Sequence, residues 1–271
     1  QMDQIVLFGD SLTQQSFSQV SPDGSPPFGF GAALANAYVR RLDVINRGLS
    51  GYNTDQALQC LDQCIPNESR ARTKLMTILF GSNDCRIAGS PGTPQTVEVD
   101  KFRLNLSNIC SQFVNGSHRK IRVVLITPPP IDERKLHRCD MEIFPHLRRD
   151  ELRRTAENTA KYAQVVRDVG RANNIPVLDL WRAFGARAGY AGDDNSMGSM
   201  KRPTNAVLQS MFNDGLHLSG AGNKVVFDEL MALIEAKFPD LMPEKLPMAQ
   251  PAWDDKTWEG VQVERPKTVC K

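Results

Sequence analysis

Near its N terminus the chain reads Ile5-Val6-Leu7-Phe8-Gly9-Asp10-Ser11-Leu12-Thr13, a continuous apolar run that ends at a glycine and two polar residues. Continuous rather than alternating hydrophobicity is typical of a parallel strand that is covered on both faces. The run therefore predicts a buried strand. It places the Ser11 hydroxyl at the carboxyl end of that strand, where doubly wound folds gather their ligands. Taken alone, the same stretch fits a helix N-cap at Ser11 equally well.

Comparable apolar runs follow along the chain, with helical patterns between them. Regular alternation of strand and helix predicts an α/β fold in which a five-stranded parallel sheet carries helices on both faces. This is a doubly wound, three-layer α/β/α arrangement with right-handed crossovers. The later strands are expected at residues 44–46, 75–80, 121–127 and 176–180, and helices at 31–41, 54–64, 97–114, 149–173 and 221–238.

Two segments interrupt this alternation. Residues 183–199 are rich in Gly, Asp, Asn and Ser and predict a long surface loop. Residues 239–271 hold five prolines together with Trp253 and Trp258, and they predict an extended tail. We therefore expect one domain over residues 1–238 and a proline-rich extension over 239–271. The tryptophans of this extension are expected to pack on that domain or, in a homodimer, on a partner subunit.

Composition narrows the range of partners. The 271 residues include 33 basic and 31 acidic side chains, so the formal net charge is +2 and no overall field points to nucleic acid or to an anionic membrane. No apolar run reaches the roughly 18 residues of a membrane-spanning helix. The first residues lack a secretory signal, so we expect a cytoplasmic protein without stable membrane insertion. The six cysteines are sparse and irregularly spaced, which predicts reduced thiols and no metal site.

A second polar segment, Asn213-Asp214-Gly215-Leu216-His217, precedes the last expected helix and places a carboxylate three residues before an imidazole. A serine hydroxyl is a poor nucleophile at neutral pH unless a base takes its proton and an acid orients that base. His217 and Asp214 can fill these two roles for Ser11. The alternative is a polar turn in which Asp214 caps the following helix.

Two further loops follow the second and third expected strands and open at the same edge of the sheet as Ser11. Acyl transfer needs hydrogen-bond donors aimed at the developing oxyanion. The N–H groups of Ser11 and Gly51 and the side-chain amide of Asn83 are the candidate oxyanion hole. Taken singly, a tight turn at Gly51 and an Asx-turn at Asn83 are the simpler interpretations. The neighbouring Asp10 and Asp84 are predicted to accept backbone N–H groups and to take no part in the chemistry.

Four blocks in order carry a resemblance to a known family: Gly9-Asp10-Ser11-Leu12, Gly51, Gly81-Ser82-Asn83-Asp84 and Asp214-Gly215-Leu216-His217. On these residues the sequence resembles the SGNH/GDSL hydrolase superfamily from Ile5 to about Phe238. The resemblance implies a flavodoxin-like SGNH hydrolase fold, with residues 1–238 as the catalytic domain of a serine esterase that uses neither cofactor nor metal. It also implies that Ser11 is the nucleophile, His217 the base, and Gly51 and Asn83 oxyanion donors.

Three longer phrases, residues 46–52, 127–132 and 214–219, resemble the isoamyl acetate-hydrolysing esterase subfamily. This resemblance implies hydrolysis of short-chain acyl esters, especially acetates such as isoamyl acetate, through an acyl-enzyme. The sequence departs from the subfamily in residues 183–199 and in the tail. Both segments can shape the mouth of the pocket, so the small-molecule ester substrate stays open.

Other functions fit the same motifs. A lysophospholipase or thioesterase would act on longer acyl chains, an acyltransferase would pass the acyl group to an alcohol, and a catalytically silent binding protein would keep the fold alone. A basic stretch can steer an anionic substrate such as a coenzyme A ester or a phospholipid, but a solvated helix face is the preferred interpretation. The stretch comprises Arg134, Lys135, Arg138, Arg148, Arg149, Arg153 and Arg154.

Overall fold

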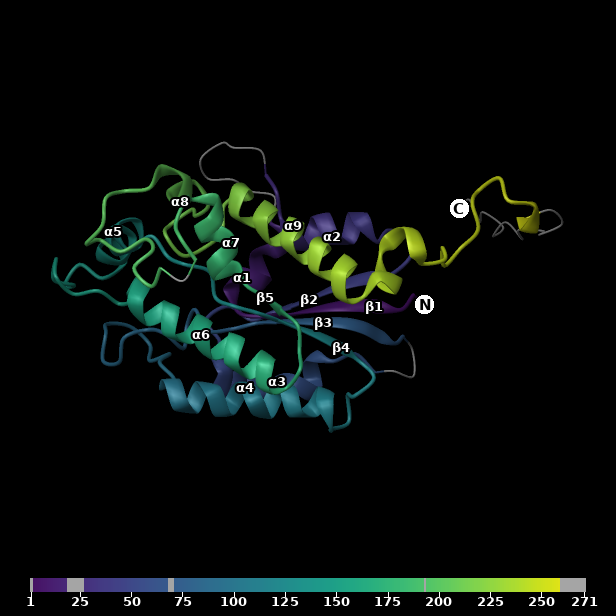
Figure 1. The fold of residues 1–271 in the computed structure, drawn as a ribbon, viewed down its shortest axis with the longest axis horizontal. Helices are drawn as coiled ribbons and strands as arrows, with labels where there is room; N and C mark the ends of the chain where they lie inside the picture. The colour runs from purple at the N-terminus through teal and green to yellow at the C-terminus, as the bar shows by residue number, and fades with distance from the viewer. Residues whose placement is uncertain (1, 19–26, 68–70, 193, 259–271) are drawn as a thin grey trace, which may run out of the picture.

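The centre of the molecule is a five-stranded sheet, seen in a computed structural model that describes residues 2–18, 27–67, 71–192 and 194–258 (Figure 1). Neighbouring strands all run parallel, in the order β2-β1-β3-β4-β5. The predicted parallel sheet is therefore confirmed. The strands are β1 (Gln4–Gly9), β2 (Asp43–Gly48), β3 (Thr73–Leu79), β4 (Arg122–Ile126) and β5 (Val177–Leu178).

Helices cover both faces of this sheet, which confirms the three-layer arrangement (Figure 1). Ile5 and Leu7 of β1 belong to the core on one face, and Val6 and Phe8 belong to the core on the other; all four are 0% exposed. Because successive side chains of a strand point to opposite faces, a strand covered on both sides is apolar throughout. One face carries α2 (Phe30–Ala37), α7 (Leu180–Arg187) and α9 (Gly220–Lys237), and the other α3 (Thr54–Cys64), α4 (Val99–Val114) and α6 (Ala156–Ala172).

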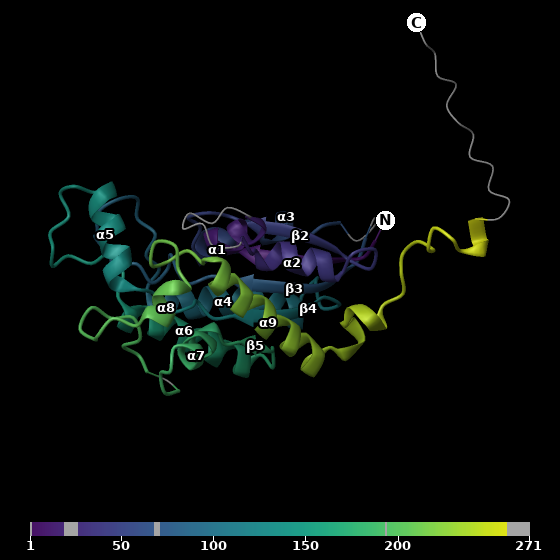
Figure 2. The ribbon, with the colours of Figure 1, turned by 90° about the horizontal axis from the view of Figure 1, so that it is seen from above.

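The two ends of the sheet differ in what they carry. Ser11, Gly51 and Asn83 follow the carboxyl ends of β1, β2 and β3, and the loop with Asp214 and His217 follows a helix, between residues 210 and 220. The first described residues and the segment after α9 lie at the opposite end (Figures 1 and 2). Among the described residues, no helix combines the length and the apolar character needed to span a membrane.

Several helices differ from the predicted ones. The helix expected over 149–173 begins only at Ala156, after Thr155 has capped it by accepting the N–H of Asn158. Residues 149–155 instead form no helix, and Arg153 and Arg154 make hydrogen bonds with the loop after β3. Four α-helices were not predicted at all: α1 (Ser11–Gln14), α5 (Glu133–Ile143), α7 and α8 (Ala206–Ser210).

Residues 183–199 match the predicted surface loop only in part: the described residues from 188 on form no helix or strand and are mostly not buried, but the start of the segment is helical. Helix α7 continues to Arg187, and Met197 is fully buried in the core, with its side chain beside Gly185 of α7. The composition did not predict this arrangement, because most residues of the segment are polar and a single apolar side chain, that of Met197, holds it against the core.

The tail contacts the domain only in part. The 3-10 turns η2 (Pro239–Leu241) and η3 (Pro243–Lys245) keep Leu241 buried against the core. Trp253 is 90% exposed, so the predicted packing of this side chain on the domain is wrong. Its packing on a partner subunit stays a prediction. A last turn, η4, covers Lys256–Trp258, and residues 259–271, with Cys270, lie outside the described part of the chain.

Candidate active site

Ser11 lies at the point where β1 passes into helix α1. Strand β1 ends at Gly9, and Asp10 caps α1 by accepting the N–H of Leu12 at 2.9 Å. Ser11 is the first residue of the helix and is 6% exposed. The N-cap interpretation of Ser11 is therefore wrong, because Asp10 occupies that position. N–H groups in the first turn have no partner within the helix, which leaves the N–H of Ser11 available to an oxyanion.

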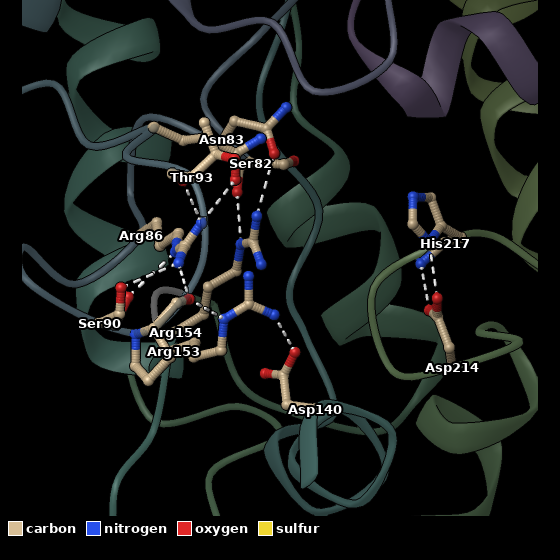
Figure 3. A network of polar contacts seen from close by, with 12 residues as sticks. Ser82, Asn83, Arg86, Ser90, Thr93, Asp140, Arg153, Arg154, Asp214 and His217 are labelled. Atoms are coloured by element: carbon tan, nitrogen blue, oxygen red, sulfur yellow. Dashed lines mark hydrogen bonds and ion pairs between the residues drawn. The ribbon is translucent and has the colours of Figure 1, made fainter. Parts of the chain in front are cut away.

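His217 stands between Ser11 and Asp214 in a chain of two hydrogen bonds. Its Nε2 lies 3.0 Å from the Ser11 Oγ, and its Nδ1 lies 2.6 Å from the Asp214 Oδ2. The pair of His217 and Asp214 is drawn in Figure 3. Both distances are within reach for a nucleophile with its base and for a base with its orienting acid. The structure thus brings together the three residues that the sequence predicts for these roles.

The loop that carries Asp214 and His217 is folded around the carboxylate. The Oδ1 atom of Asp214 accepts the N–H groups of Leu216 and His217 at 2.9 and 2.7 Å. Helix α9 follows, and Ser219 caps it by accepting the N–H of Gly222 at 3.3 Å. The alternative in which Asp214 caps this helix is therefore wrong, and its carboxylate is free to hold the imidazole.

The acidity of Asp214 fits this arrangement. Burial alone would raise its pKa, but the hydrogen bonds and charge of His217, together with the N–H of Leu216, lower the pKa to about 2. Asp214 is therefore ionised at neutral pH and accepts a hydrogen bond from the Nδ1–H of His217. That bond selects the tautomer whose Nε2 lone pair faces Ser11.

The other two candidate donors lie on the loops after β2 and β3. Gly51 has a φ of +82°, which favours glycine, and the Gln95 side chain fixes the turn by donating to the Gly51 carbonyl at 2.9 Å. Asn83 is 4% exposed, and its Nδ2 donates to the Tyr52 carbonyl at 2.9 Å. One amide hydrogen is then left for an oxyanion. The Asx-turn interpretation of Asn83 is wrong, because its side chain bonds to another loop.

Arg154 orients the Asn83 amide, a role that the sequence did not indicate. Arg154 is 5% exposed, and its guanidinium donates to the Ser82 carbonyl at 2.7 Å and to the Asn83 Oδ1 at 3.0 Å (Figure 3). Since a guanidinium only donates, it must meet the amide oxygen and leaves the amide NH₂ facing away. The neighbouring Arg153 pairs with the buried Asp140. The interpretation as a solvated helix face is therefore wrong for both arginines.

Arg154 should contribute to the reaction only through Asn83. We expect Asn83→Ala to lower kcat by about 10²- to 10³-fold, because an oxyanion donor is lost. Arg154→Met, which leaves the amide unoriented, should lower kcat by roughly 10-fold or more with little change in KM. Steady-state kinetics of both single variants and the double variant test this. The double variant should be no slower than Asn83→Ala alone, and additive losses would contradict the positioning role.

Asp10 and Asp84 hold the loops in place. The Oδ1 atom of Asp84 accepts both the N–H and the hydroxyl of Thr54, at 2.9 and 2.5 Å, and so ties the start of α3 to the loop after β3. The predicted acceptor role of both carboxylates is confirmed. Each also has a buried Oδ2 without a hydrogen-bond partner among the described residues. Burial raises the pKa of Asp10 to about 6 and that of Asp84 to about 7.

The raised pKa of Asp84 predicts a pH-dependent stability. A carboxyl whose pKa rises from 3.8 to about 7 on folding favours the folded state at low pH, and this contribution is lost as the pH rises through 7. Asp84→Asn keeps an acceptor for Thr54 but cannot ionise. Between pH 5 and pH 8 the free energy of unfolding of the native chain should therefore fall by about 2–3 kcal/mol relative to the variant. Urea unfolding at both pH values measures this, with the exposed Asp62→Asn as control, and equal pH dependence of all three proteins would contradict it.

Metal and thiol chemistry find no support in the described residues. Within them, no three or more His, Cys, Asp or Glu side chains are arranged to hold a metal ion. The predicted reduced thiols are confirmed for the five described cysteines. Burial raises the pKa of Cys85 to about 11 and that of Cys110 to about 12, which keeps both protonated and unreactive.

Comparison with known proteins gives the family and relatives of the chain. A model of the GDSL-like lipase/acylhydrolase family matches residues 7–225. The chain is 35% identical to a GDSL esterase/lipase of Arabidopsis thaliana, with 92% of this chain and 91% of that protein covered. It is 30% identical to the isoamyl acetate-hydrolyzing esterase of Saccharomyces cerevisiae, with 96% and 98% covered. Its fold is similar to the crystal structure of a lipase/acylhydrolase from Enterococcus faecalis, with a TM-score of 0.58, 24% identity, and 92% and 100% of the two chains covered.

Proposed function

The chain belongs to the GDSL-like lipase/acylhydrolase family and is a carboxylic ester hydrolase, and we propose that it cleaves short-chain acyl esters, acetates above all, with Ser11 as nucleophile. One observation carries the serine mechanism. Ser11, His217 and Asp214 lie in a continuous chain of hydrogen bonds of 3.0 and 2.6 Å, at the carboxyl end of a strand inside the sheet. Acyl transfer by a serine requires a hydroxyl as nucleophile, a base to take its proton and an acid to orient the base, and these three residues supply the groups in that order.

In the first half of the reaction, the Ser11 Oγ attacks the ester carbonyl carbon while its proton moves to the His217 Nε2. Asp214 stabilises the imidazolium that forms. The carbonyl oxygen becomes an oxyanion among the N–H groups of Ser11 and Gly51 and the Asn83 amide. The C–O bond to the leaving alcohol then breaks, the alcohol takes the proton from His217, and the acyl group remains on Ser11.

The second half uses the same groups with water in place of serine. His217 takes a proton from water as the water oxygen attacks the acyl carbon. The second oxyanion collapses, the bond to Ser11 Oγ breaks, and the serine regains its proton from His217. The carboxylic acid leaves, and no cofactor or metal is required.

The preference for short acyl groups rests on the relatives named for isoamyl acetate. We expect kcat/KM on p-nitrophenyl esters to be highest for acetate or butyrate and to fall by about 10-fold or more at decanoate, because an acyl site shaped for a short chain cannot hold a long one. Initial rates along the series test this. A rise toward long chains would instead favour a lysophospholipase or thioesterase. Ester formation from added alcohols, measured by product analysis, would reveal an acyltransferase.

A further inference from the structure

One face of helix α5 forms the wall of a cavity outside the proposed active site. Arg134, His137, Arg138 and Met141 are three or four positions apart, so they share one side of the helix. With Arg149 they line a cavity of about 500 Å³, a size common for small-molecule sites. None of the lining residues belongs to the triad or to the three oxyanion donors.

The cavity is cationic, and no opposite charge within it balances that. Among the described residues that line it, none is acidic; the far wall adds the neutral Thr204 and Gln209. The two buried acids of α5 are engaged elsewhere. Glu133 accepts the N–H groups of Ala156 and Met200 at 2.6 Å each, and Asp140 pairs with Arg153. Helix α5 thus directs its buried acids toward the domain, whereas Arg134, His137 and Arg138 line the cavity.

Three of the four basic side chains that line the cavity have no acceptor among the described residues. His137 is 5% exposed, and neither of its ring nitrogens has a hydrogen-bond partner among the described residues. An imidazole always carries at least one N–H, so the wall of the cavity holds a buried donor that no described residue satisfies. Arg138 and Arg149 form no ion pair with any residue that the structure describes. Arg134 is held in place by donating to the carbonyls of Met200 and Arg202.

We propose that this cavity binds an oxyanion, of the phosphate class, attached to a short apolar chain. The exposed guanidinium groups of Arg138, on α5, and of Arg149, in the segment after it, supply donors for phosphate oxygens. Met141 and Met200 offer flexible apolar surface for the attached chain. Helix α5 also supports the triad loop, since the Asp132 N–H donates to the Gly215 carbonyl at 2.9 Å. The bound ligand therefore lies against the same helix as that loop.

The test is calorimetric titration with hexyl phosphate of the native chain and of two charge-matched double variants. Arg138→Gln with Arg149→Gln removes two exposed arginines of the cavity. Arg119→Gln with Lys120→Gln removes two exposed basic residues ahead of β4, at the other end of the sheet. We expect one site on the native chain, affinity at least about 10-fold weaker in the cavity variant, and unchanged affinity in the control. Thermal unfolding checks that both variants fold.

Two comparisons decide whether the proposal stands: the affinities of the two double variants, and the affinities for hexyl phosphate and for inorganic phosphate. Equal affinity of the two double variants, or no saturable binding to the native chain, would overturn it. Inorganic phosphate is titrated in parallel. Weaker binding of phosphate than of hexyl phosphate supports an amphiphilic ligand, whereas equal binding would show a site for the free anion and refute the role of the methionines.

Discussion

Ser11→Ala is expected to lower kcat by about 10⁴- to 10⁶-fold, because it removes the only atom that can form the proposed acyl-enzyme. The Oγ is 3.0 Å from the His217 Nε2, so its loss leaves the base without a nucleophile to activate. The oxyanion donors remain, and they should account for whatever rate exceeds that in water. Initial rates on p-nitrophenyl acetate measure the effect.

The matched control is Ser107→Ala, since the Ser107 hydroxyl donates to the Arg103 carbonyl on helix α4, away from the strand ends. This variant should hydrolyse the ester at the native rate. If Ser11→Ala also kept the native rate, Ser11 would not be the nucleophile, even though the chain would remain an ester hydrolase by family.

Asp214→Asn should lower kcat by about 10⁴-fold while leaving the loop intact. The asparagine oxygen can still accept the N–H groups of Leu216 and His217. Its NH₂ group, however, would donate to the His217 Nδ1 and favour the tautomer that places a hydrogen on Nε2. His217 could then no longer take the proton from Ser11. Steady-state kinetics at pH 7 test this loss.

A second aspartate–histidine pair provides the control. The Asp62 Oδ1 atom lies 3.1 Å from the His118 Nε2. The Asp62 side chain is 84% exposed. Asp62→Asn removes the same kind of contact outside the site and should leave kcat unchanged. If both asparagine variants lost activity equally, the effect would not come from the triad.

Stability needs to be followed alongside activity in Asp214→Asn. The pKa of Asp214 falls from 3.8 to about 2 on folding, so its contribution to stability is present above pH 4 and is lost as the pH falls toward 2. At pH 7 the variant should lose on the order of 1 kcal/mol, because solvent screens a side chain that is one-third exposed. Urea unfolding separates this modest cost from the loss of catalysis.

The fold was largely predictable because its strands are buried on both faces. Ile5 to Phe8 are apolar without interruption, and such runs predict strands whichever helix lies above or below them. Helix α5 escaped prediction for the opposite reason. The buried face of α5 has helical spacing, but Leu136 is its one apolar member, beside Glu133, His137 and Asp140, so no apolar stripe marks it.

The candidate site divides in the same way. Ser11, Asp214 and His217 lie in short motifs whose residue types reveal their chemistry. Arg154 does not, because its contact with Asn83 joins residues 71 positions apart and depends on where the chain enters α6. The basic stretch was predicted as one solvated helix face. In the structure Arg154 is buried beside Asn83, Arg153 pairs with Asp140, and Arg134, Arg138 and Arg149 line the α5 cavity. Local composition cannot distinguish those environments.

The placement of the chain ends has a practical consequence. The first described residues and the segment after α9 lie at the amino end of the sheet, whereas the loops of Ser11, Gly51, Asn83 and His217 lie at the carboxyl end (Figure 1). A bead, electrode or fusion partner attached at Met2, or at the described segment after α9, would therefore hold the molecule with the loops of the proposed active site turned toward the bulk solution. Immobilised enzyme should keep its access to dissolved esters.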